Sequence, residues 1–129
     1  MHAIDTNVVV RYVVGDGGDQ YARAVAIVEK EAVLIPLTVV LEAEWVLRDA
    51  YEFKRDEVLA AFRKVFGLPT VKVAEPAVVQ RAMVLAASGL DFADAMHLAQ
   101  AGGCAAFVTF DKQLARRALH AAGTEVRLA

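Results

Sequence analysis

Short apolar runs alternate with longer amphipathic segments along the 129-residue chain. The short runs predict strands near residues 2–5, 33–36, 70–74, 105–110 and 125–128. The longer segments predict helices near residues 6–14, 20–31, 38–52, 56–66, 76–88, 92–102 and 112–122. Strands that alternate with helices indicate βαβ units around a parallel sheet. Since such crossovers are right-handed, we expect an α/β fold, a three-layer α/β/α sandwich, in a single domain over residues 1–129.

The segment 6–14 is ambiguous. Its valines, in Val8-Val9-Val10 and Tyr12-Val13-Val14, favour a strand by propensity. Against this, Asp5-Thr6-Asn7 offers capping residues at its start and Gly15 offers a stop. A crossover is also needed before the next strand, so we predict a helix.

Acidic residues stand at the strand ends and helix starts of this pattern. Asp5 follows the first strand and Asp111 the fourth, while Glu42 and Asp94 lie near the starts of two helices. If the strands are parallel, Asp5 and Asp111 share the edge of the sheet where such folds bind ligands. Two carboxylates ~4 Å apart repel by roughly 4 kcal/mol at an effective dielectric of ~20. A divalent cation would offset that repulsion, so the pattern predicts a metal-dependent hydrolase.

Each acid also has a purely structural explanation. Asp5 and Asp111 suit helix N-caps, and Glu42 suits a first-turn acid that complements the helix dipole. Asp94 could be the third-position partner of an Asp91 cap. The sequence leaves capping and catalysis open for Asp5 and Asp111.

Helical geometry favours a functional role for the other two acids. In the predicted helix that carries Glu42, the side chains expected to face the core are Val39, Ala43, Val46, Leu47 and Ala50, which form an inner arc. Glu42 lies at the edge of that arc, apart from an open flank with Glu44 and Arg48, and Trp45 is expected to pack in or near the core. The helix that carries Asp94 is apolar nearly all round, and an anion on such a helix indicates function.

Polar neighbours border the four acids. Thr6, Asn7 and Thr109 could hold a water or orient a carboxylate, or serve only as turn and cap residues. Asp91 fits a supporting N-cap better than a metal ligand, and His97 fits a hydrogen-bonded core or interface residue. The sequence has no Gly-rich phosphate loop, zinc-type Cys/His spacing or nucleophile elbow.

Hydrophobic residues make up 57% of the chain. Part of this excess fits strands buried on both faces of a parallel sheet, and part fits an apolar surface that another chain covers. No apolar run is long enough to span a membrane. The first strand begins almost at Met1, so we expect no signal peptide and a cytoplasmic protein, with the single Cys104 as a buried thiol.

The net charge of −2 gives no general attraction for nucleic acid. Basic pairs occur at Lys54-Arg55, Arg63-Lys64 and Arg116-Arg117. They permit RNA binding without predicting it.

Four segments, in order, carry a resemblance to a known family. They are Ile4-Asp5-Thr6-Asn7, then Pro36-Leu37-Thr38 leading to Glu42 and Trp45, then Asp91-Phe92-Ala93-Asp94-Ala95-Met96-His97-Leu98-Ala99, then Thr109-Phe110-Asp111. Together they resemble the PIN-domain nucleases, and among these the VapC toxins of prokaryotic toxin–antitoxin pairs. The loop with Gly17-Gly18 departs mildly from the family, which often has more acid or Pro there, and affects no site residue.

The resemblance implies a five-stranded parallel sheet of order 3-2-1-4-5 and cleavage of RNA with Mg²⁺ or Mn²⁺. The catalytic acids would be Asp5, Glu42, Asp94 and Asp111, with support from Thr6, Asn7 and Thr109. Asp5, Asp94 and Asp111 would hold the metal, and Glu42 or Asp111 would orient or deprotonate the attacking water. The resemblance also implies a homodimer and a small VapB-like antitoxin, through which alone the protein would contact DNA.

Other classes fit less well. A haloacid-dehalogenase-type phosphatase needs a second Asp two residues after its nucleophile, where this chain has Asn7. A receiver domain needs paired acids after its first strand and a central phospho-accepting Asp, and neither is evident. A non-catalytic RNA-binding or dimerisation module on the same fold stays open, and metal-dependent cleavage of RNA would separate it from a nuclease.

Overall fold

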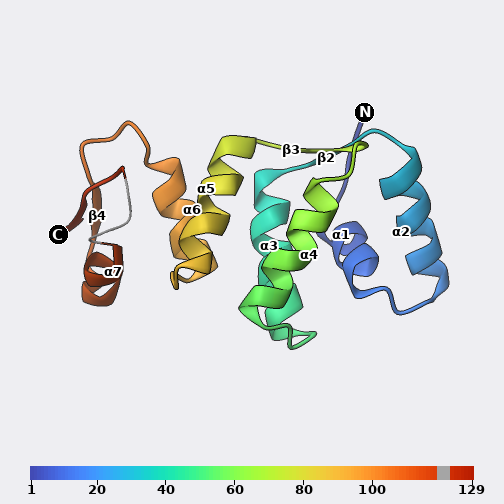
Figure 1. Cartoon of the computed structure of the whole chain (residues 1–129), viewed down its shortest axis with the longest axis horizontal. Coiled ribbons are helices and arrows are strands. Elements are labelled where there is room, and N and C mark those ends of the chain that lie inside the picture. Colours follow the sequence, from blue (N-terminus) through green and yellow to red (C-terminus); the bar gives the residue numbers. More distant parts are fainter. Residues whose placement is uncertain (119–122) are drawn as a thin grey trace. The chain divides into compact units, whose positions relative to one another are not determined.

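The structure is a computed structural model that describes residues 1–118 and 123–129 (Figure 1). The chain forms two compact units, Met1–Pro76 and Ala77–Ala129. Each unit is described by itself below.

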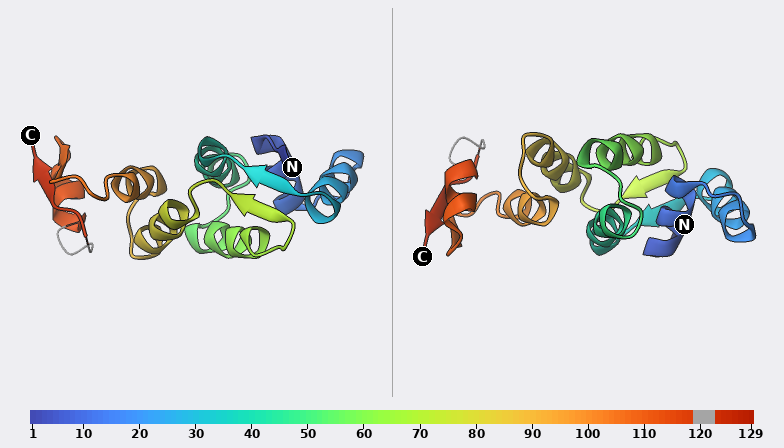
Figure 2. Two further views of the ribbon diagram at one scale, coloured as in Figure 1. Left: turned by 90° about the horizontal axis from the view of Figure 1, so that it is seen from above. Right: turned by 90° about the horizontal axis from the view of Figure 1, so that it is seen from below.

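The first unit is a three-stranded parallel sheet with four helices. Its elements are β1 (His2–Ala3), α1 (Thr6–Val14), α2 (Asp19–Lys30), β2 (Val33–Ile35), α3 (Leu37–Asp49), α4 (Arg55–Phe66) and β3 (Val71–Val73). The strand order is β1-β2-β3, and the common direction of β2 and β3 is visible in Figure 2. The ladder continues past β1, since the Ile4 amide donates to the Leu34 carbonyl at 3.0 Å.

The core of this unit lies around the central strand β2. Val33 and Ile35 of β2, which point to the same face of the sheet, are fully buried, and Leu34 on the opposite face is half-buried. Helix α1 packs against α2 and α3, and α3 packs against α4. The main buried helical side chains are Val9, Val28, Val40, Leu47, Val58 and Phe62.

The ambiguous segment is a helix, as predicted. Asp5 caps α1 at its start, and Gly15 ends it in the left-handed conformation with φ 63°. The Gly15 amide donates to the Arg11 carbonyl at 3.1 Å. These local hydrogen bonds outweigh the strand propensity of the valines, of which Val9 and Val10 become the buried stripe of the helix.

The second unit, over its described residues, combines three helices with a two-stranded sheet. Its elements are α5 (Pro76–Ala87), α6 (Phe92–Gln100), β4 (Phe107–Thr109), α7 (Lys112–Arg117) and β5 (Val126–Leu128). Strands β4 and β5 are parallel, and α7 packs against both. Three large apolar side chains at this sheet are exposed: Val108, Leu128 and Phe110, which is 88% exposed.

The alternation of strands and helices is confirmed, and the α/β class with it. Each strand is shorter than its apolar run; β2, for example, stops before Pro36, which has no amide to donate. Over the described residues the strands form two sheets, β1-β2-β3 in the first unit and β4-β5 in the second. The end of the last predicted helix, residues 119–122, lies outside the described residues.

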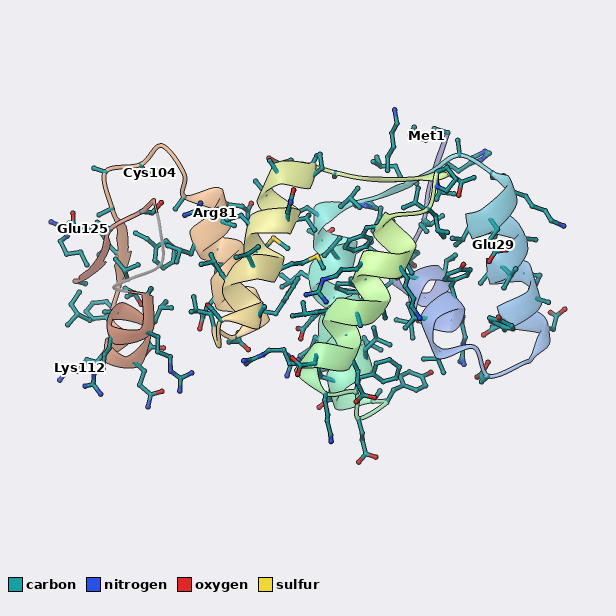
Figure 3. All side chains as sticks on the ribbon, in the orientation of Figure 1. Met1, Glu29, Arg81, Cys104, Lys112 and Glu125 are labelled. Atoms are coloured by element: carbon teal, nitrogen blue, oxygen red, sulfur yellow. The ribbon has the colours of Figure 1, made fainter. Side chains whose placement is uncertain are left out.

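Two further observations concern membrane-spanning helices and the single cysteine. No helix in the described ranges is long and apolar enough to cross a membrane. The expectation for Cys104 was wrong, because this thiol is exposed in the loop between α6 and β4 (Figure 3).

Candidate active site

Asp5 stands at the junction of β1 and α1 in the first unit. Its Oδ1 accepts the first amide of α1, from Thr6, at 2.7 Å. The capping explanation is therefore confirmed. It does not exclude a metal ligand, since the side chain is exposed and its second oxygen has no hydrogen-bond partner among residues 1–118 and 123–129.

Thr6 joins Asp5 to Glu42. The Thr6 side chain is only 5% exposed, and its hydroxyl donates a hydrogen bond to Oε1 of Glu42. The two residues are 36 positions apart, in α1 and α3, which pack together. Glu42 lies beyond the first turn of α3, which contains no acid, so the explanation of Glu42 as a first-turn acid was wrong. A buried hydroxyl therefore fixes the Glu42 carboxylate beside the helix that Asp5 caps.

The burial of α3 differs from the prediction. Glu42 is exposed, whereas Glu44, placed on the open flank, is only 4% exposed. Arg48 binds Glu44 through two guanidinium nitrogens, one of them at 3.1 Å, and this pairing lets the carboxylate be buried. Trp45 is 56% exposed rather than packed in the core. The covered face of α3 is therefore turned toward Val40, Ala43, Glu44 and Leu47.

Asp94 lies in the first turn of α6 in the second unit. Its amide donates to the Asp91 cap at 3.4 Å, which confirms Asp91 as the N-cap of α6. Burial raises the pKa of Asp94, the carboxylates of Asp91 and Asp111 raise it further, and His97 opposes the shift. No donor in the described part of the chain binds the Asp94 carboxylate, so this anion is half-buried among like charges.

Asp111 caps α7, as the structural explanation predicted. Its Oδ1 accepts the amides of Gln113 at 2.9 Å and Leu114 at 3.0 Å. Thr109 Oγ1 in turn accepts the Asp111 amide at 3.0 Å, so Thr109 is a turn residue that fixes the Asp111 backbone. The second Asp111 oxygen carries no hydrogen bond within the described ranges and stays available to a ligand.

The donor chemistry fits a hard divalent cation. Asp5 and Asp111 each offer an unbonded carboxylate oxygen, and oxygen ligands are what Mg²⁺ and Mn²⁺ prefer. The repulsion that raises the pKa of Asp94 is what a bound cation would relieve. Neither unit, over its described residues, gathers three or more His, Cys, Asp or Glu side chains within reach of one metal.

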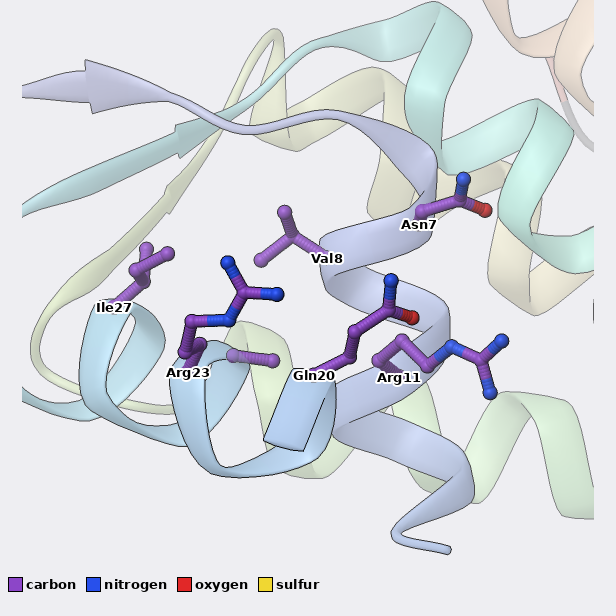
Figure 4. Close-up of a pocket in the computed structure, with 7 residues that line it drawn as sticks. Asn7, Val8, Arg11, Gln20, Arg23 and Ile27 are labelled. Carbon is purple, nitrogen blue, oxygen red and sulfur yellow. The ribbon is translucent and has the colours of Figure 1, made fainter. Parts of the chain in front are cut away.

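Asn7 opens onto a groove between α1 and α2 of the first unit (Figure 4). The groove has a volume of about 380 Å³. It is lined by Asn7, Val8, Arg11, Gln20, Arg23, Ala24 and Ile27. Asn7, one of its lining residues, directly follows Asp5 and Thr6 in the sequence.

Sequence reasoning missed three features. The Thr6–Glu42 hydrogen bond spans 36 residues and has no local signal. The Glu44–Arg48 pair has one, because acid and base four residues apart face each other on a helix. The groove could not be predicted, since it depends on how α1 packs against α2.

Comparison of the sequence with known proteins identifies a family. No curated protein matches the chain. The family model of the PIN domain matches residues 3–119, which include every acid of the candidate site. PIN domains have a nuclease fold and are typically metal-dependent, with Mg²⁺ or Mn²⁺. Because the match covers most of the sequence, the chain belongs to the PIN-domain family.

Proposed function

We propose that this PIN domain is a Mg²⁺- or Mn²⁺-dependent endoribonuclease, and that it is the VapC-type toxin of a toxin–antitoxin pair. The observation that carries the proposal is the hydrogen bond from buried Thr6 to Glu42. It brings together two acidic motifs of the family at the start of α1, where Asp5 presents an exposed carboxylate.

The proposal includes one five-stranded sheet of order 3-2-1-4-5 in a single domain. Among the described residues of its own unit, β1 pairs with β2 on one side, and β4 pairs with β5. Two-stranded parallel sheets with exposed faces are rare, and the bare side chains of Val108, Phe110 and Leu128 favour further cover. Pairing of β1 with β4 would supply it, and would put Asp5 and Asp111 at the same sheet edge.

In this account the acids have separate tasks. Asp5, Asp94 and Asp111 would hold the metal, and Glu42 would orient the attacking water and take its proton. Thr6 holds Glu42 in place through its hydroxyl. The bound metal would lower the pKa of a water and offset charge on the phosphate.

The partners belong to the same proposal. A cytoplasmic homodimer and a small DNA-binding antitoxin are expected, and exposed Trp45 and Val84 support apolar surfaces that partners cover. An antitoxin arginine would suit the acidic site, because guanidinium binds carboxylates bidentately.

Incubation of purified, antitoxin-free protein with total RNA tests the activity. We expect discrete cleavage products with Mn²⁺ and none with chelator. A toxin additionally requires that its expression arrest growth and that the product of an adjacent gene relieve the arrest. Cleavage without any such inhibitor would leave a PIN nuclease of another role.

A further inference from the structure

The groove between α1 and α2 is built like an anion site with an apolar floor. Val8, Ala24 and Ile27 form the floor. The polar residues that line the groove are Arg11, Arg23, Asn7 and Gln20 (Figure 4). No carboxylate is among the lining residues, so every charge in the groove is positive.

Both arginines have donors to spare. Arg11 pairs with Asp16 at 2.9 Å and Arg23 with Asp19 at 3.1 Å, in each case through one nitrogen. Both Asp16 and Asp19 lie outside the lining, and the Arg23–Asp19 pair is strongly exposed. Exposed ion pairs hold their partners weakly, and guanidinium has five donors, so an incoming anion can share or replace the acid.

We propose that this groove binds the sugar–phosphate backbone of the single-stranded RNA substrate, on one side of the cleavage site. The inference rests on the nuclease function proposed above. Asn7 lies two residues from Asp5, and Arg11 lies one helical turn further, about 6 Å along α1. Along α1, the donors of Asn7 and Arg11 therefore connect the groove to Asp5.

An RNA strand suits the groove better than an acidic peptide does. Guanidinium forks match phosphate oxygens bidentately, and the apolar floor suits the face of a ribose or base. The volume of about 380 Å³ lies at the lower end of the range for small-molecule sites. That space fits about one nucleotide unit rather than a folded peptide segment.

The first experiment measures binding without cleavage. A short fluorescein-labelled single-stranded RNA is titrated with the full chain in chelator, at several salt concentrations, by anisotropy. The double variant Arg11→Gln/Arg23→Gln should weaken binding on the order of tenfold or more. It should also lower the slope of log affinity against log salt by about 1.4, or about 0.7 for each lost phosphate contact.

The matched control removes the same charge elsewhere. Arg55→Gln/Arg63→Gln replaces two exposed arginines of α4, outside the groove. It should change the affinity and the salt slope by less than half as much. Equal effects of the two double variants would overturn the groove and leave only general charge attraction.

A gain of affinity provides a second test that loss of folding cannot imitate. Asp19→Asn frees Arg23 from its acidic partner and should tighten RNA binding. Asp56→Asn on α4 changes the net charge equally and should not match that gain. An Asp19→Asn affinity no greater than that of Asp56→Asn contradicts the proposal.

The outcomes separate this inference from the proposed function. A wild type that cleaves RNA while the groove variants keep wild-type affinity and slope overturns the groove alone. Absence of RNA binding by the wild type in chelator also overturns it. A protein that shows the predicted binding pattern but no metal-dependent cleavage keeps the groove and loses the nuclease. Loss of an acidic protein partner, with RNA binding intact, would assign the groove to that partner instead.

Discussion

At the scale of single residues, Thr6 and Asp94 are the side chains whose surroundings say most about function. The buried Thr6 hydroxyl donates a hydrogen bond to the carboxylate of Glu42, which is an exposed residue. Asp94 is half-buried beside two like charges with no described donor to its carboxylate. A fold under no functional demand would gain stability by changing Asp94.

Thr6→Ala should reduce RNA cleavage by about 10–100-fold, the usual cost of losing a group that orients a catalytic ligand. Thr6→Ser keeps the hydroxyl and should retain most activity. Initial rates at saturating Mn²⁺ measure both. Equal rates for the Ala and Ser variants would show that the hydrogen bond to Glu42 has no catalytic role.

Asp94→Asn should stabilise the metal-free protein near neutral pH by a small amount, since Asp94 is only half-buried. Its pKa is raised on folding, so its contribution to stability is present at low pH and is lost as pH rises through the folded value. The advantage of Asn should therefore appear above about pH 4, the usual carboxyl pKa, and vanish below it. Denaturant unfolding of both proteins at several pH values tests this, with exposed Asp56→Asn as the control. An advantage of Asn that did not depend on pH would refute the electrostatic explanation.

At the scale of elements, helix caps and candidate ligands are the same residues. Asp5, Asp91 and Asp111 each accept amides at the start of a helix. Capping orients these carboxylates through the backbone, which is a rigid way to position a metal ligand. Capping and catalysis are therefore not alternatives for Asp5 and Asp111.

Asp5→Asn and Asp5→Ala separate the two roles. Asn caps about as well as Asp, so Asp5→Asn should be neutral or stabilising without metal, whereas Asp5→Ala should cost about 1 kcal/mol. Both should lower cleavage by about 100-fold or more, because each removes the anionic oxygen. Thermal unfolding and cleavage rates are compared for the pair. If Asp5→Asn kept wild-type cleavage, Asp5 would be a cap alone.

The elements were predictable because their signals are local. The capping residue Asp5 and the stop at Gly15 predicted the start and end of α1, and Pro36 marks the boundary between β2 and α3. Which face of a helix is covered is not local. Periodicity placed Glu42 near the inner arc of α3, yet Glu44 is the buried acid because Arg48 neutralises it. The predictions that Trp45 packs in or near the core and that Cys104 is buried were wrong for the same reason, because both residues are exposed. An apolar stretch of sequence does not specify what packs over a residue.

At the scale of the whole molecule, the account requires acids from both units to bind one cation. In the proposed site, Asp5 and Glu42 would come from the first unit, and Asp94 and Asp111 from the second. The family motifs predicted this set of four, but their mutual distances depend on long-range strand pairing that no sequence motif encodes. This requirement for both units can be tested by a signal from one unit that reports metal binding and by a substitution in the other unit.

Trp45 makes that measurement possible. It is the only tryptophan and lies in the first unit. Mn²⁺ at 100 times its dissociation constant should raise the melting temperature followed by Trp45 fluorescence by roughly 10 °C. Asp111→Asn, in the second unit, should remove most of this shift, and exposed Glu125→Gln should not. A shift that survives Asp111→Asn would mean that metal binding does not need Asp111.

The most direct measurement is the rate of RNA cleavage as a function of Mn²⁺ concentration, for wild type, Glu42→Gln and Asp94→Asn, with exposed Glu52→Gln as the control. The account predicts a rate that rises and saturates with Mn²⁺ in wild type and Glu52→Gln. It predicts a loss of about 100-fold or more in the other two variants, one altered in each unit. Cleavage that needs no divalent metal, or that persists in Glu42→Gln and Asp94→Asn, would contradict it.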